Sequence, residues 1–159
     1  MMRPLMYRGK NLLLYADDAI VVVYKPAGLA VQTKKMGEKD LESLLRTWQA
    51  GQGAGTYIGV VHRLDQPVEG VMVLARTKEA AAALSAQAAG TDMQKTYVAV
   101  TRGVLPKVEG QLTDFLLRDG KTNTSRVVDR KTPGAKKASL DYRIPPVPDK
   151  RKLQNDSNA

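Results

Sequence analysis

A carboxylate and a guanidinium stand two positions apart near the middle of the chain, where residues 62–65 read His-Arg-Leu-Asp. A carboxylate held in a loop between strands can act as a nucleophile at an electron-poor carbon or as a general base. Asp65 is therefore the first candidate for chemistry. By itself the pattern also suits a structural role, in which Asp65 forms a turn or pairs with Arg63.

Two apolar stretches flank these residues and are expected to hold them in place. Residues 57–61 predict a strand that ends at His62, and residues 71–75 predict a second strand after a turn at Pro67 and Gly70. Residues 12–15 and 19–25 predict two earlier strands. The loop that carries Asp65 is thus expected to hang from a sheet, where catalytic groups are commonly placed.

Helices and later strands complete the expected order of elements. Asp40 and Thr77 are expected N-caps for helices over residues 41–49 and 78–89. The alternation in residues 95–102 predicts a strand with Lys95 and Tyr97 on one face. Weaker extended segments follow at residues 110–117, 126–129 and 137–144. Together these elements predict an α+β fold.

The composition excludes several kinds of site. The 159 residues include no cysteine and one histidine, so disulfides, thiolate metal sites and multi-histidine metal sites are excluded. No glycine-rich dinucleotide motif or Walker loop follows a predicted strand, and no cofactor is expected. No apolar run approaches the length of a signal peptide or a membrane span, so we expect a cytoplasmic protein without membrane contact.

The net charge of +9 is unevenly distributed. Residues 1–117 hold 14 Lys and Arg against 11 Asp and Glu, whereas residues 118–152 hold 11 against 4. A basic segment attached to a nearly neutral core suits a polyanionic partner such as RNA. A solvated basic face remains the alternative explanation.

Several motifs resemble those of one known family. Residues 62–65, with Gly70 and the Ala-Arg-Thr at 75–77, resemble the signature of the pseudouridine synthases of the RluA type. Residues 25–29 (Lys-Pro-Ala-Gly-Leu), 95–99 (Lys-Thr-Tyr-Val-Ala) and 138–144 are similar to further family features in the same order. The sequence departs from the family at Val68 and Glu69, where many members have Thr-Ser. It also lacks the family's Gly-Arg-x-His-Gln-Ile-Arg strand after Ile144.

The resemblance implies a pseudouridine synthase catalytic domain over residues 12–144, with a mixed, mainly antiparallel sheet flanked by helices and with its C-terminal strands missing. Residues 145–159 are expected to form a disordered basic and polar tail. The resemblance assigns the catalytic carboxylate to Asp65. It further suggests that Arg63 fills the gap left by a flipped uridine and that Tyr97 stacks on the base.

His62 is expected to brace the Asp65 loop through hydrogen bonds. Lys25 suits a phosphate contact and an exposed strand end equally well.

The expected function is isomerisation of uridine to pseudouridine in ribosomal or transfer RNA, without a small-molecule cofactor. One alternative is a catalytically inactive RNA-binding remnant of the same family, because the missing strand carries the arginine expected to pair with Asp65. A second alternative is a small basic ribosome-associated protein without an active site, which would leave the His-Arg-Leu-Asp match to chance.

Overall fold

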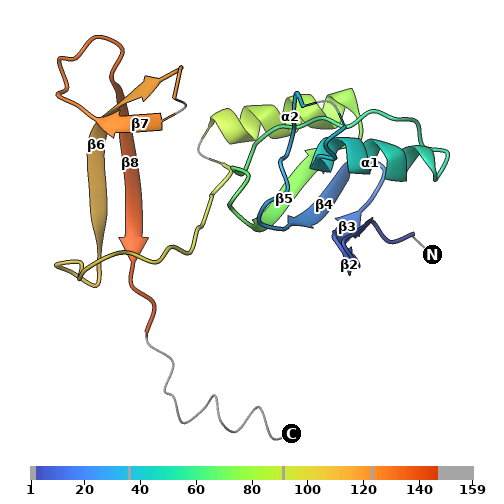
Figure 1. Ribbon diagram of the computed structural model, residues 1–159, viewed down its shortest axis with the longest axis horizontal. Coiled ribbons are helices and arrows are strands. Elements are labelled where there is room, and N and C mark those ends of the chain that lie inside the picture. Colours follow the sequence, from blue (N-terminus) through green and yellow to red (C-terminus); the bar gives the residue numbers. More distant parts are fainter. Residues whose placement is uncertain (1–2, 36, 91, 123, 147–159) are drawn as a thin grey trace, which may run out of the picture. The chain divides into compact units, whose positions relative to one another are not determined.

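The computed structural model describes residues 3–35, 37–90, 92–122 and 124–146, which fall into two compact units, Met1–Tyr97 and Val98–Ala159. The first unit contains β1 (Met6–Tyr7), β2 (Lys10–Asn11), β3 (Leu13–Ala16), β4 (Ile20–Lys25), α1 (Leu41–Ala50), β5 (Gly70–Ala75) and α2 (Lys78–Ala89). The second contains β6 (Glu109–Asp119), β7 (Thr124–Val127) and β8 (Lys136–Arg143) (Figure 1). Residues 147–159, on which the prediction of a disordered tail falls, lie outside the described residues.

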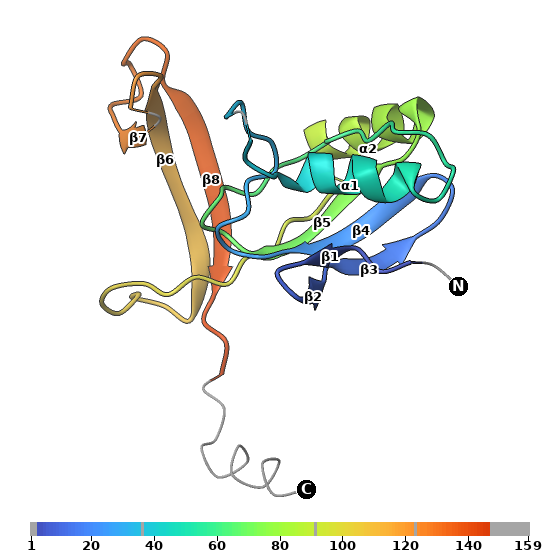
Figure 2. The same cartoon turned by 45° about the vertical axis from the view of Figure 1, so that its right-hand side comes forward.

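The main sheet of the first unit has the order β3-β4-β5, with both ladders antiparallel. Strand β4 is central, and its register with β5 runs without interruption from Ile20 opposite Ala75 to Lys25 opposite Gly70. Both helices lie on the same side of this sheet (Figures 1 and 2). The sheet face beneath them carries the core.

The core follows from the two periodicities of strand and helix. Val21 and Val23 of β4 are fully buried, as are Met72 and Leu74 of β5, because alternate strand residues point to one face. Leu41, Leu45 and Trp48 of α1 pack against them. The helix begins where predicted, since the Asp40 carboxylate accepts a hydrogen bond from the Ser43 backbone N–H at 2.8 Å.

Helix α2 lies close to the edge of the sheet. It begins after Thr77, whose hydroxyl accepts a hydrogen bond from the Ala80 backbone N–H. A Cβ added at Gly59 would lie 2.9 Å from Cβ of Ala81 and 3.2 Å from Cβ of Ala75. Gly59 therefore permits the close approach of the helix, the sheet and the segment that leads to His62.

The first unit also includes residues before Leu12, where the predicted domain begins. Leu5 is buried in the core, and the indole Nε1 of Trp48 donates a hydrogen bond to the carbonyl of Arg3 at 2.8 Å. A single domain over residues 12–144 stays a prediction.

The second unit is a sheet of order β7-β6-β8, again antiparallel throughout. Its long strands β6 and β8 lie side by side (Figures 1 and 2) and confirm the extended segments expected there. Among the described residues β8 pairs with β6 alone, so its other edge has no strand partner.

The α+β class is confirmed, with two corrections to individual elements. All ladders between the described strands are antiparallel, and they form three separate sheets. The predicted strand over residues 57–61 is reduced to one bridge between Gly59 and Ala75. The predicted strand over residues 95–102 is not formed, because this exposed segment makes no ladder with a neighbour. No helix in the described ranges is long and apolar enough to cross a membrane.

Candidate active site

Asp65 lies on an exposed loop between the Gly59 bridge and β5. Its carbonyl accepts a hydrogen bond from the Val68 backbone N–H at 3.0 Å, which closes a turn over residues 65–68. This confirms the turn expected around Pro67. Asp65 is exposed to solvent.

The loop is fastened to the end of β4 by the side chain of Lys25. Strand alternation places Lys25 on the same face as Val21 and Val23, so the side chain enters the interior and is fully buried. Its ammonium donates hydrogen bonds to the carbonyls of Leu29 (2.8 Å), Pro26 (3.1 Å) and Gln66 (3.3 Å). These three acceptors use its three protons. Both sequence readings of Lys25 are therefore wrong, because it is neither exposed nor free to bind a phosphate.

Two further hydrogen bonds join the same segments. The Gly28 backbone N–H donates to the Gln66 carbonyl at 2.8 Å, and the Gln66 side-chain amide donates to the Gly28 carbonyl at 3.1 Å. Gly28 has a φ of 84°, a left-handed conformation that favours glycine. We call Lys25, Gly28 and Gln66 the clamp. It fixes the backbone one residue after Asp65.

Two carboxylates, those of Asp65 and Glu69, lie near the Lys25 ammonium of the clamp. Burial lowers the pKa of Lys25, while the carboxylates of Asp65 and Glu69 act in the opposite direction. Partial burial and then a hydrogen bond to Glu69 raise the pKa of Tyr24. Asp65 and Glu69 therefore both lie near the Lys25 ammonium. Sequence reasoning treated Glu69 only as a departure from the family pattern.

His62 takes the place of a strand partner on the outer edge of β5. Gly59 exchanges both backbone hydrogen bonds with Ala75, and the next outward N–H of β5, that of Val73, donates to Nε2 of His62 at 3.2 Å. Burial, and then the positive charge of Lys95, lower the pKa of His62. The neutral ring that accepts from Val73 is thus favoured. This geometry agrees with the bracing role expected of His62, which stays a prediction.

Arg63 and Tyr97, unlike Lys25 and His62, are exposed side chains. Arg63 is exposed, and among the described residues no ion pair joins it to Asp65. Tyr97 is 60% exposed, lies outside any strand and has no recorded contact with Asp65. The charge of Lys95 lowers the pKa of His62, so Lys95, two residues before Tyr97, lies near the loop that carries Asp65. The roles of Arg63 and Tyr97 stay predictions.

Within the described part of the chain, no group of three or more His, Cys, Asp or Glu residues could hold a metal ion. The loop beside the clamp carries two exposed carboxylates, Asp65 and Glu69. Sequence reasoning missed the part that Gln66 and Glu69 play here. The sequence signals for this region were the His-Arg-Leu-Asp motif at residues 62–65 and the Lys-Pro-Ala-Gly turn at residues 25–28.

A profile of the family described as RNA pseudouridylate synthase matches residues 19–151. The chain belongs to this family. The family match confirms the resemblance to the RluA type. The second alternative, which left the His-Arg-Leu-Asp match to chance, is therefore wrong.

Individual relatives agree with the family match. A tRNA pseudouridine synthase C of Pectobacterium carotovorum subsp. carotovorum is 38% identical over 120 residues, which cover 73% of this chain and 31% of that protein. A ribosomal large subunit pseudouridine synthase D of Xanthomonas campestris pv. campestris is 42% identical over 95 residues, 58% of this chain and 28% of that protein. The chain spans less than half the length of these relatives.

A solved structure shows the same fold. Human RNA pseudouridylate synthase domain containing 4 is similar with a TM-score of 0.67 and 24% identity, covering 82% of this chain and 52% of the human chain.

Proposed function

We propose that this chain carries the catalytic carboxylate of an RNA pseudouridine synthase that acts on transfer or ribosomal RNA, and that Asp65 is that carboxylate. The observation that carries the proposal is the clamp, which holds the backbone beside an exposed carboxylate in a chain of this family. The names of the relatives support the two classes of RNA.

The reaction needs little beyond a well-placed carboxylate. The glycosidic bond to a ring nitrogen of uracil breaks, the base turns, and a bond forms between the sugar and a ring carbon. A proton leaves that carbon and one is taken up by the nitrogen, so no electron, metal or group donor is consumed. Asp65 serves either as a nucleophile or as the base that removes the proton.

The uridine has to leave its stack to meet Asp65, which costs a few kcal/mol. We expect Arg63 to assist, because it is exposed and no recorded ion pair among the described residues joins it to Asp65, which leaves its guanidinium able to stack or bind a phosphate. Tyr97 is exposed and offers an aromatic ring for the base. Both functions form part of the proposal.

The inactive RNA-binding remnant is the second candidate, and one observation favours it. No hydrogen bond or ion pair to the Asp65 carboxylate is recorded among the described residues. The Lys25 ammonium acts on it electrostatically, but that ammonium already donates to three carbonyls. A catalytic carboxylate is normally positioned by such partners.

The test compares the full chain with Asp65→Asn and with the control Asp18→Asn, which removes another exposed carboxylate, in the turn after β3. Unmodified transfer and ribosomal RNA transcripts are incubated with each protein, and pseudouridine is measured by nucleoside mass spectrometry. We expect formation with the wild type and the control and none with Asp65→Asn. Turnover by Asp65→Asn would remove Asp65 from the mechanism. RNA binding without turnover by the wild type would establish the remnant.

A further inference from the structure

A two-residue turn joins β1 to β2 and carries an arginine in an unusual conformation. Tyr7 pairs with Lys10, so Arg8 and Gly9 form the turn. Their φ angles are 47° and 78°, the positive values that the central residues of a type I′ turn require. In the described ranges Arg8 is the only residue other than glycine with a positive φ. Asparagine adopts this conformation more readily than arginine, so the turn alone does not account for an arginine at this position.

The guanidinium of Arg8 is exposed and unpaired in the described part of the chain. It lies over the Tyr7 ring, with its central carbon 5.4 Å from the ring centroid, and no hydrogen bond or ion pair to it is recorded there. Stacking of this kind leaves the N–H groups at the rim of a guanidinium available to an acceptor. Lys10 is exposed as well, and residues 3–16 contain no Asp or Glu. We call residues 7–10 the basic hairpin.

The base of the hairpin is fixed to the core of the first unit. The side-chain oxygen of Asn11 accepts hydrogen bonds from the N–H groups of Leu5 at 3.0 Å and Leu13 at 3.1 Å. The Leu12 N–H donates to the Leu5 carbonyl at 2.8 Å. Because Leu5 and Leu12 are both buried, these bonds hold the turn at a defined place beside the sheet.

That place is the end of the sheet to which the Asp65 loop is attached. The Leu12 carbonyl accepts a hydrogen bond from the Tyr24 N–H at 2.8 Å. The next residue of β4, Lys25, donates to the Gln66 carbonyl beside Asp65. The hairpin and the Asp65 loop are therefore fastened to neighbouring residues of one strand. The hairpin lies on the side of the sheet away from both helices (Figures 1 and 2).

A polyanion that docks at this end of the sheet needs cations there. Asp65 and Glu69 bring two negative charges, which repel phosphates. The ammonium of Lys25 already donates to three carbonyls and has no proton left for a phosphate. Arg8 and Lys10 supply two exposed positive charges that offset this repulsion.

We infer that the basic hairpin binds phosphates of the RNA substrate through the Arg8 guanidinium and the Lys10 ammonium. A guanidinium held flat on a ring presents several donors in one plane, which suits the oxygens of a phosphate. The inference rests on the proposed function for the identity of the partner as RNA. It adds a binding surface separate from the Asp65 loop and from the basic residues of the second unit.

The variant Arg8→Asn tests the hairpin without endangering the fold, because Asn-Gly is a preferred pair for this turn. We expect it to melt at or above the wild-type temperature and yet to bind unmodified transfer or ribosomal RNA transcripts more weakly. The slope of log affinity against log salt should fall by about 0.7–0.9, and by about twice as much when Lys10→Gln is added. Arg8→Lys keeps the charge and should keep the slope.

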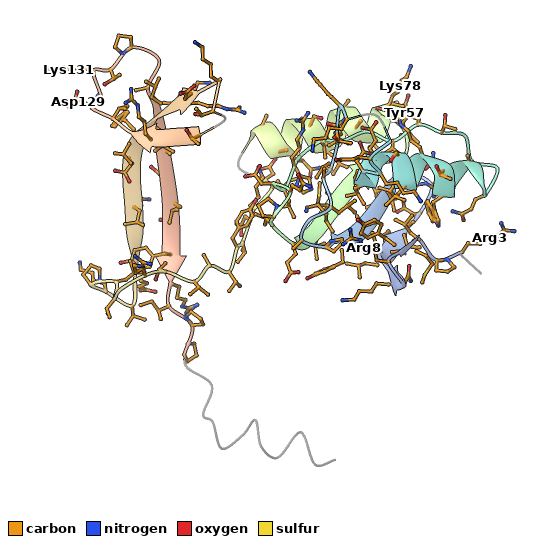
Figure 3. The ribbon with its side chains drawn as sticks, in the orientation of Figure 1. Arg3, Arg8, Tyr57, Lys78, Asp129 and Lys131 are labelled. Carbon is orange, nitrogen blue, oxygen red and sulfur yellow. The ribbon has the colours of Figure 1, made fainter. Side chains whose placement is uncertain are left out.

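The matched control is Lys78→Gln, which removes one exposed positive charge from the first turn of α2. This helix follows β5 at the end of the sheet opposite the Asp65 loop, and Lys78 and Arg8 lie on opposite sides of the sheet (Figure 3). The control should keep the wild-type slope.

Pseudouridine formation, measured on the same transcripts, separates this inference from the proposed activity. If the wild type forms pseudouridine and Arg8→Asn keeps its affinity and slope, the inference is wrong and the proposed function stands. If the slope falls as expected but the wild type forms no pseudouridine, the hairpin binds RNA and the proposed activity fails. A wild type that binds neither kind of transcript, or an equal loss of slope in Lys78→Gln, would also overturn the inference.

Discussion

Replacing Lys25 with methionine should loosen the clamp while preserving the volume of the side chain. The buried ammonium is the shared donor for three carbonyls, and one of them, that of Gln66, comes from 41 positions along the chain. Methionine fills the same space without donating any hydrogen bond. The substitution therefore probes the hydrogen bonds separately from a cavity.

The magnitude follows from which carbonyls keep a partner. The Gln66 carbonyl still accepts from the Gly28 N–H, and the Pro26 carbonyl still accepts from the Leu29 N–H. The Leu29 carbonyl loses its recorded partner in the interior. An unsatisfied buried acceptor costs about 1–3 kcal/mol. For a unit of this size that corresponds to a fall of roughly 4–20 °C in melting temperature.

Urea unfolding followed by Trp48 fluorescence measures the effect, because this single tryptophan lies in the core of the first unit. The control is Lys78→Met, which removes an exposed lysine from the first turn of α2 (Figure 3). We also expect faster amide exchange at Gly28. A free energy of unfolding equal to or above that of the wild type would show that the relief of burying an ammonium outweighs the lost hydrogen bonds, and would refute the clamp.

Two further predictions concern the pH dependence of stability and the salt dependence of RNA binding. The pKa of His62 in the folded chain is below its ordinary value of 6.5, so the unfolded chain binds more protons between the two values. The free energy of unfolding should fall as the pH is lowered through about 6.5. The difference in free energy of unfolding between wild type and His62→Asn should be constant above this pH and shrink below it. A difference that stays constant at every pH would contradict the buried neutral ring. The exposed residues Arg126, Arg130 and Lys136 are expected to contact RNA phosphates. Changing all three to Gln should reduce the slope of log affinity against log salt by up to about 2, and an unchanged slope would mark them as a solubilising face.

Local signals in the sequence were sufficient for the helices and for the turns. Asp40 and Thr77 cap the two helices as expected, because a capping side chain bonds to a backbone N–H three residues away. The β-branched run in β4 and the turn after Asp65 depend on equally short-range preferences. The identity of the family was readable for a similar reason, since the His-Arg-Leu-Asp motif is contiguous.

Long-range contacts decided the rest of the site. Lys25 follows two valines on the inner face of β4, but whether a lysine there is buried depends on carbonyls that only the folded chain assembles from Leu29 and Gln66. Likewise, residues 57–61 are apolar enough for a strand, yet the ring of His62 occupies the N–H of Val73 that a longer strand would bond. A sequence pattern reports the preferences of neighbours along the chain. Burial of a charge and competition for one backbone donor are set by groups that meet only in space.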